Sequence, residues 1–276
     1  MTESILSPEV RRFLESMHGD SHLHELFQIG DNARSEQTCH DEAHGKAVES
    51  VAADIVAYIA SKAPLQLSDA DILSTLASAY LHDIGSVTGA DNHHRTGAKL
   101  ANHYLRRCNA DVAIRRRVCL AIALHRTSSV LDNDFAFSDV AHAICVIADK
   151  CVGDENRVRP AIKQKLTILA ASGQIDQFTG SVHDLVNFSI QEAQVLIDGP
   201  DVVSAADMGT IILQIKLREH LDDAAKVYEL YDRRFRSCVK ASTFLGFAFR
   251  LEFNGHRYHL TEGGWTLINP TCFSLE

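Results

Sequence analysis

The five residues Leu81-His82-Asp83-Ile84-Gly85 decide the fold of this 276-residue chain. They end a segment that begins at the capping sequence Ser68-Asp69-Ala70-Asp71 and carries apolar residues at helical spacing, which predicts a helix over 68–85. Asp83 follows Ala79 by four positions and therefore projects to the apolar side of this helix. A carboxylate is almost never buried unpaired, because removing its charge from water costs several kcal/mol. Another part of the chain must therefore compensate Asp83.

Three other segments direct polar side chains toward the same interior. The apolar periodicity predicts further helices over 41–62, 92–108, 110–126, 138–151 and 159–172. His44, His125 and Asp149 each stand one helical turn from a residue of an apolar stripe. Four helices thus each bring a histidine or an aspartate to the core side. A single case would be an ordinary hydrogen-bonded core residue, but four together indicate a shared site.

Imidazole nitrogens and carboxylate oxygens are together the ligands of a divalent metal. Such a set suits Zn, Mn, Fe, Co or Ni, and a bound cation offsets the cost of burying the carboxylates. The seven cysteines form no C-x-x-C pair, which argues against a thiolate zinc site and favours reduced, mostly buried thiols. The sequence therefore predicts a histidine and aspartate metal site inside a helical domain.

The order His44, His82-Asp83, Asp149 resembles the signature of the HD-domain superfamily of metal-dependent phosphohydrolases. The resemblance covers about residues 35–160 and implies an all-helical core. A His-Asp pair alone is a weak signal, since His183-Asp184 occurs in the same chain. The specificity comes from the conjunction of all three motifs in this order.

The resemblance also implies two divalent metal ions, chosen from Mn, Fe, Ni, Co, Zn and Mg. In dinuclear members, a histidine soon after the pair and another at the end of the next helix complete the site, and His93 and His125 match these positions. The implied ligands of one ion are His44, His82, Asp83 and Asp149, and those of the other are Asp83, His93 and His125, with Asp83 bridging. His94 remains an alternative to His93. His40 is either an extra ligand or partner of the site, or a surface residue.

The implied reaction is hydrolysis of a phosphate ester or anhydride by a hydroxide that bridges the metals, with Asp83 as the central catalytic residue. The expected substrate is a small phosphorylated molecule such as a nucleotide. Lys150 and Arg126 each follow an implied ligand and are expected to reach a phosphate group. Arg157 and Arg159 are candidate ligands of a substrate phosphate, although this basic run is equally typical of a solvated helix face.

Two other functions stay open: a di-iron oxygenase of the same fold, and a non-catalytic binding or regulatory module. The cyclic-di-GMP phosphodiesterase subfamily is disfavoured, because Ile84-Gly85-Ser86 replaces its I-G-K and no G-Y-P occurs. Stretches after the core, including residues 182–194 and 244–255, resemble a little-characterised group of prokaryotic HD phosphohydrolases with a C-terminal α+β region. The chain has neither G-x-x-x-x-G-K-[ST] nor G-x-S-x-G, which excludes a P-loop and a nucleophile elbow.

Charge and hydropathy limit the partners and the location. The 27 Lys and Arg against 36 Asp and Glu give a net charge of −9, which disfavours nucleic acid and anionic membranes as partners. Adjacent arginines such as Arg115, Arg116 and Arg117 point in different directions on a helix and indicate no binding stripe. An N-terminal signal and a long apolar stretch are both absent from the sequence, so we expect a cytoplasmic protein without membrane contact.

The pattern changes after Gly173. Strands are expected over 187–197, 210–217 and 247–253, with a helix over 221–245 and turns at Asp198-Gly199-Pro200-Asp201 and Asn254-Gly255. We therefore expect a mainly α protein with a helical HD-type domain over 1–172 and a smaller C-terminal α+β subdomain over 173–276. The phenylalanine-rich end of this subdomain predicts a packing and dimerisation element, and hence a homodimer.

Overall fold

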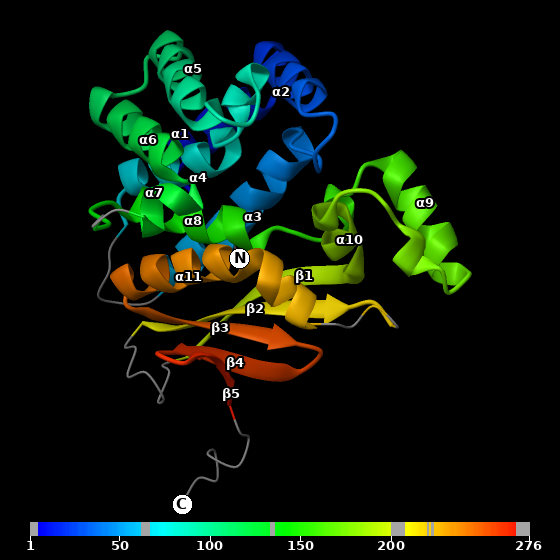
Figure 1. Ribbon diagram of the computed structural model, residues 1–276. Helices are drawn as coiled ribbons and strands as arrows, with labels where there is room; N and C mark the ends of the chain where they lie inside the picture. Colours follow the sequence, from blue (N-terminus) through cyan, green and yellow to red (C-terminus); the bar gives the residue numbers. More distant parts are fainter. Residues whose placement is uncertain are drawn as a thin grey trace, which may run out of the picture.

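A layer of helices lies on one side of a five-stranded sheet in the computed structural model of the protein (Figure 1). The structure describes residues 5–61, 67–132, 136–199, 208–219, 221 and 224–268. Lys62, at the end of the first expected helix, and Pro200 and Asp201 of the expected turn lie outside the described residues. The prediction of a mainly α fold with a C-terminal α+β part is confirmed at this level.

The N-terminal part of the described chain is built from helices joined by short links. They are α1 (Pro8–His18), α2 (Ser21–Ala33), α3 (Glu42–Ser61), α4 (Asp69–Leu81), the 3₁₀ turn η2 (Ile84–Thr88), α5 (His93–Arg107), α6 (Val112–Leu124), α7 (Thr127–Leu131), α8 (Val140–Cys151), the 3₁₀ turn η3 (Glu155–Arg157) and α9 (Pro160–Ala171). All six helices expected in this part are present, with ends that differ by a few residues.

Side-chain caps and one buried ion network hold the helices that carry the site. Ser68 and Asp71 form a reciprocal capping box at the start of α4, so the orphan backbone N–H groups there are satisfied. Arg117 of α6 donates to Asp71 of α4 and to Asp139, which itself caps α8. Arg117, from the middle of α6, therefore ties the starts of α4 and α8 together. Arg117 is thus part of the framework, a role that the sequence did not predict.

The C-terminal part contains the sheet and two further helices. Its elements are the 3₁₀ turn η4 (Ile175–Gln177), α10 (Val182–Ser189), β1 (Ile190–Asp198), β2 (Gly209–Leu217), α11 (Ala224–Phe244), β3 (Phe247–Phe253), β4 (His256–Thr261) and β5 (Gly264–Leu267). The strands are in the order β1-β2-β3-β4-β5. All neighbours are antiparallel except β2 and β3, which are parallel because α11 connects them.

One expected boundary is wrong. The strand predicted from Asn187 begins only at Ile190, and Asn187 itself lies in α10. Ser181 caps this helix by accepting a hydrogen bond from the His183 backbone N–H, and Val186 and Phe188 are buried. Cap and packing therefore outweigh the strand propensity of the segment. The expected strand at 210–217, the helix at 221–245 and the strand at 247–253 are close to β2, α11 and β3.

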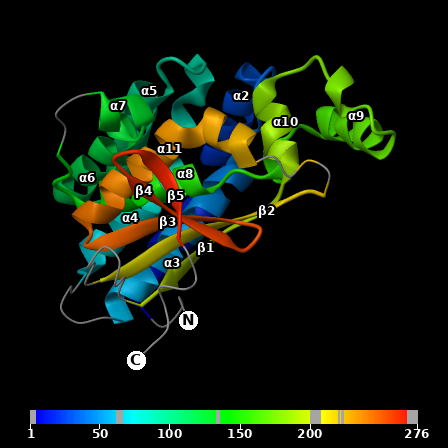
Figure 2. The same ribbon diagram turned by 60° about the horizontal axis from the view of Figure 1, so that its bottom comes forward.

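Helix α11 lies between the sheet and the helical part, as Figures 1 and 2 show from two sides. Its buried face includes Tyr231, Phe235 and Cys238, and it packs against α8 and β3. One hydrophobic cluster runs from Val10 in α1 to Phe253 in β3. The C-terminal part is thus a packing element, as predicted. The proposed division at residue 172 and the homodimer stay predictions.

Two expectations about the surface and the thiols can be compared with the described residues. No helix among them is both long and apolar enough to cross a bilayer. Their cysteines are all free, and Cys272 lies outside them. Phe244, placed in the apolar cluster by the sequence, is 41% exposed at the end of α11.

The turn after α4 packs directly on the backbone of α5. A Cβ added at Gly85 would overlap the backbone O of His93 and the backbone N of Gly97. Only glycine permits this approach, which sets the distance between the His82-Asp83 pair and the start of α5.

We expect Gly85→Ala to lower the free energy of unfolding by about 3 kcal/mol or more, because η2 and α5 must separate. Urea denaturation followed by circular dichroism measures this. Gly19→Ala is the matched control, since a Cβ there would lie 3.4 Å from Glu15 O in ordinary contact. Equal stability of both variants would show that the close approach of η2 and α5 is not required.

Candidate metal centre

Six buried histidine and aspartate side chains converge from five helices. They are His44 of α3, His82 at the end of α4, Asp83 directly after it, His93 at the start of α5, His125 at the end of α6, and Asp149 in the last turn of α8. Each has at most 7% of its surface exposed. The structure therefore brings together all six residues that the sequence singled out.

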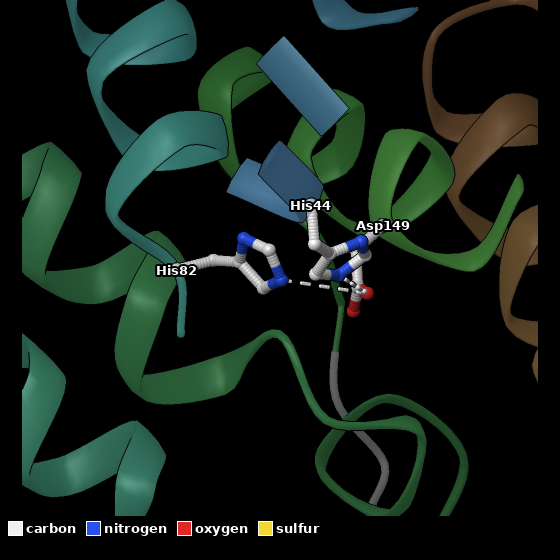
Figure 3. A group of neighbouring side chains, drawn as sticks. All are labelled: His44, His82 and Asp149. Atoms are coloured by element: carbon white, nitrogen blue, oxygen red, sulfur yellow. Dashed lines mark ion pairs between the residues drawn. The ribbon is translucent and has the colours of Figure 1, made fainter. Parts of the chain in front are cut away.

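His44, His82 and Asp149 form the first group, and their side chains point toward one another (Figure 3). His82 Nε2 lies 3.5 Å from Asp149 Oδ1, and His44 Nε2 lies 3.8 Å from the same oxygen. One ligand atom from each residue lies within 4.8 Å of the others, which is a spacing that could hold a metal ion.

Asp83, His93 and His125 form the second group. Asp83 Oδ1 lies 3.3 Å from His93 Nε2 and 3.9 Å from His125 Nε2. The other oxygen, Asp83 Oδ2, faces the first group, 3.3 Å from His82 Nε2 and 3.9 Å from His44 Nε2. The two oxygens of one carboxylate thus face different histidines, which is the arrangement of a bridging ligand.

Backbone carbonyls orient three of the imidazoles. The Nδ1 atoms of His82, His93 and His125 lie 2.8, 2.6 and 2.7 Å from carbonyl oxygens three residues earlier in the chain. A carbonyl can only accept, so Nδ1 carries a proton in each of the three rings, and Nε2 is the nitrogen that faces the cluster. This second bond is the usual device that fixes a metal-binding tautomer.

The electrostatics of the cluster favour a positive charge at its centre. Burial alone would lower the pKa of His82, but the Asp83 and Asp149 carboxylates outweigh burial and raise it to about 10. Burial likewise opposes ionisation of Asp83, yet His82 and its neighbours hold the pKa of Asp83 well below the usual range. Burial also opposes ionisation of Asp149, but Lys150 and His82 hold its pKa well below the usual range. Both carboxylates are therefore charged at neutral pH.

A divalent cation fits this donor set. His82 Nε2 is buried and has no hydrogen-bond partner in the described structure, although it faces two carboxylates. The combination of imidazole nitrogen and carboxylate oxygen matches Zn, Mn, Fe, Co or Ni. The described residues offer a place for a cation in each of the two groups.

The structure distinguishes the two adjacent histidines and places a third beside the cluster. His93 belongs to the second group, whereas His94 turns away from it toward a neighbouring surface depression. His40 precedes α3, with Nε2 4.0 Å from Asp83 Oδ2 and Nδ1 2.5 Å from the Thr38 carbonyl oxygen. His40 is thus a partner at the rim of the cluster rather than a residue of the outer surface.

The expected phosphate-binding cations fall into two sets. Lys150 pairs with Asp149, and Arg126 and Arg157 also border the same cavity. Arg159 does not border it. This guanidinium pairs with Asp31 at 2.9 Å and donates to the carbonyl oxygens of residues 31, 34 and 37. Arg159 therefore holds the loop that carries Arg34 and His40 and is not placed to touch a substrate.

The cluster forms the floor of a cavity of about 790 Å³. Sequence reasoning missed several residues of its wall, namely Arg34 from the loop after α2, His183 and Asn187 from α10, and Tyr231, Arg233 and Arg234 from α11. Arg34 lies 3.9 Å from Asp83 Oδ1 and donates to Ser86 Oγ. None of these residues stands at a spacing that links it to the histidine motifs, so the sequence contains no signal for them.

The helical core thus carries a convergent cluster of histidines and aspartates at helix ends. Residues 43–160 match the family model described as HD domain. The resemblance noted in the sequence is therefore confirmed. No curated protein sequence matches the chain.

His93→Ala should remove one of two bound Mn²⁺ equivalents, because it deletes a ligand of the second group only. Elemental analysis of protein dialysed against MnCl₂ measures the ratio. His94→Ala is the matched control and should keep both equivalents. The assignment fails if the two variants bind the same amount of metal.

Arg159→Gln should destabilise the protein by about 1–2 kcal/mol at pH 7, since a charged hydrogen-bonded pair in a half-exposed position is lost. Burial raises the pKa of Asp31, but hydrogen bonds from Arg159 outweigh this and keep the pKa below 3.8. A lowered folded-state pKa contributes stability above the unfolded value, and that stability disappears as pH falls through the folded value.

The difference in the free energy of unfolding between wild type and Arg159→Gln should therefore shrink below about pH 4. Urea unfolding at pH 7 and at low pH checks this. Arg12→Gln removes an exposed pair with Glu9 and should change stability little at either pH. A pH-independent difference for Arg159→Gln would contradict the role of Asp31.

Proposed function

We propose that the protein is a metal-dependent phosphohydrolase that acts on a small phosphorylated molecule. The observation that carries the proposal is the position of the Asp83 carboxylate. One of its oxygens faces the histidines of the first group, the other faces those of the second group, and both groups lie at the floor of a cation-lined cavity. The HD domain supports the same reaction class.

In this proposal His44, His82, Asp83 and Asp149 hold one divalent cation, and Asp83, His93 and His125 hold the second. Bound as a pair, such ions supply Lewis-acid activation of water and of a phosphoryl oxygen. The protein's own contribution is orientation. The carbonyl-bound Nδ1 atoms keep the three imidazoles fixed, and burial of the cluster strengthens every charge interaction within it.

Cationic side chains around the cluster account for phosphate binding. Lys150 lies beside Asp149, and Arg126 and Arg157 line the same cavity, so each could neutralise charge on a phosphate that is bound at the floor. Arg126 donates to the Asp91 carbonyl oxygen, which fixes it at the rim. We assign these three residues to substrate binding and to stabilising the leaving group.

A nucleotide remains the expected substrate, with recognition centred on its phosphates. Apart from histidines, Tyr231 is the only aromatic side chain among the described residues of the cavity wall, and Arg234 lies over its ring. One face of the Tyr231 ring is therefore covered by a guanidinium, which supports recognition through the phosphates. The proposal also includes the cytoplasmic location predicted from the sequence.

Asp83→Ala should abolish both metal binding and turnover of p-nitrophenyl phosphate, because it removes the carboxylate shared by the two groups. A colorimetric assay with Mn²⁺ and elemental analysis measure the two effects. Asp184→Asn, in the second His-Asp pair of the chain, is the control and should retain activity, since Asp184 is not in the cavity wall. Full activity of Asp83→Ala would refute the proposal.

The same assay without oxygen separates hydrolysis from the oxygenase alternative. Hydrolysis consumes water and should proceed unchanged under argon. Loss of all turnover on removal of oxygen would favour a di-iron oxygenase. Metal binding without any turnover of a panel of phosphate esters would favour a binding module.

A further inference from the structure

Among the described residues, three arginines of the cavity wall, Arg126, Arg157 and Arg234, have no carboxylate within ion-pair distance. Arg157 and Arg234 are the two of these that act on one another. Arg157 is only 9% exposed, and its Nη1 and Nη2 atoms contact the rings of His44 and His40 rather than an acidic group. Its Nε atom has no hydrogen-bond partner in the described structure. The Asp83 and Asp149 carboxylates act on this guanidinium without forming an ion pair with it. A buried guanidinium with an unpaired donor is costly, which indicates that a negatively charged ligand completes the site.

Arg234 belongs to α11 in the C-terminal part and borders the same cavity as Arg157. Burial, together with repulsion by the Arg234 guanidinium, lowers the pKa of Arg157, although the Asp83 and Asp149 carboxylates act in the opposite sense. Among the described residues no carboxylate oxygen lies within ion-pair distance of Arg234. Its Nη2 atom donates instead to the Asp149 backbone oxygen at 3.2 Å. Two like charges thus share one side of the cavity.

The position of Arg234 is fixed by its neighbours. Its guanidinium carbon lies 4.5 Å from the centre of the Tyr231 ring, and Tyr231 donates its hydroxyl hydrogen bond to Asn187 Oδ1 of α10. Gly153 adjoins Arg234 on the cavity side, and a Cβ there would lie 3.9 Å from Arg234 Nη1. The absence of a side chain at Gly153 leaves space in front of the guanidinium.

From these observations we propose that Arg157 and Arg234 form a subsite for a second phosphoryl group of the substrate, beside the one held at the histidine and aspartate cluster. The substrate class is then a small molecule with two phosphoryl groups. This inference rests on the proposed function and deepens it. Guanidinium groups suit the role because their planar donors bind phosphate oxygens in pairs.

The C-terminal part is then a determinant of specificity as well as a packing element. Arg157 belongs to the HD domain, whereas Arg234 lies outside the residues that match the family. The subsite therefore exists only where α11 packs against α8.

The test compares two non-hydrolysable probes by isothermal titration calorimetry on the full chain supplied with MnCl₂. Methylenebisphosphonate carries two phosphonate groups, and methylphosphonate carries one. We expect wild type to bind the bisphosphonate at least about 10-fold more tightly, which is the effect of one or more charge-assisted hydrogen bonds. Arg234→Gln should reduce this preference to about 3-fold or less.

Arg236→Gln is the matched control. Arg236 lies on the same helix, pairs with Asp232 and does not border the cavity, so the preference should remain. Arg234→Lys keeps the charge and should retain part of the preference, which separates charge from packing. A wild type without preference, or an Arg234→Gln variant with the full preference, would overturn the subsite.

The subsite would also be overturned if Arg234→Lys and Arg234→Gln lost the bisphosphonate preference equally and both had a lower melting temperature. Arg234 would then have a structural role only. Failure of the proposed function has a different signature. In that case no phosphate ester is hydrolysed, while the bisphosphonate preference and its loss in Arg234→Gln are still observed by calorimetry.

Discussion

The buried charge of Asp83 constrains the surrounding structure. Its two oxygens face histidines from four different helices, at distances of 3.3 to 3.9 Å. Such a charge is tolerated inside a protein only if its partners are held in place. The caps of α4 and α8, the Arg117 network between them and the glycine contact between η2 and α5 all serve this placement.

Helix ends are where these partners are found, and there is a physical reason. The last carbonyls of a helix lack intrahelical donors, so a histidine at the C-cap can donate its Nδ1–H to one of them. His82 and His125 both do this, and His93 does the same with the loop before α5. One local bond thus satisfies the backbone and fixes the imidazole, leaving Nε2 for the centre of the cluster.

The C-terminal part connects to the site through α11. The parallel pairing of β2 and β3 requires a crossover, and that crossover is α11, which buries one face against α8 and the sheet. Its position brings Arg234 to the backbone of Asp149. Packing and recognition are therefore linked. A change in the sheet that shifts α11 also shifts a cation of the cavity wall.

Helical spacing and the cost of a buried carboxylate are properties of short segments, so the sequence alone predicted the helices of the N-terminal part and four site residues, His44, Asp83, His125 and Asp149. The resemblance to the HD-domain superfamily added His82 and His93. Tertiary structure decided what depends on contacts between segments. Adjacent side chains on a helix point about 100° apart. The choice of His93 over His94 therefore follows from how α5 packs on Gly85. Arg157 borders the cavity and Arg159 does not, although only one residue separates them in the sequence. Arg234 borders the same cavity although it follows Arg157 by 77 positions. Only the packing of α3, α8 and α11 brings these segments together.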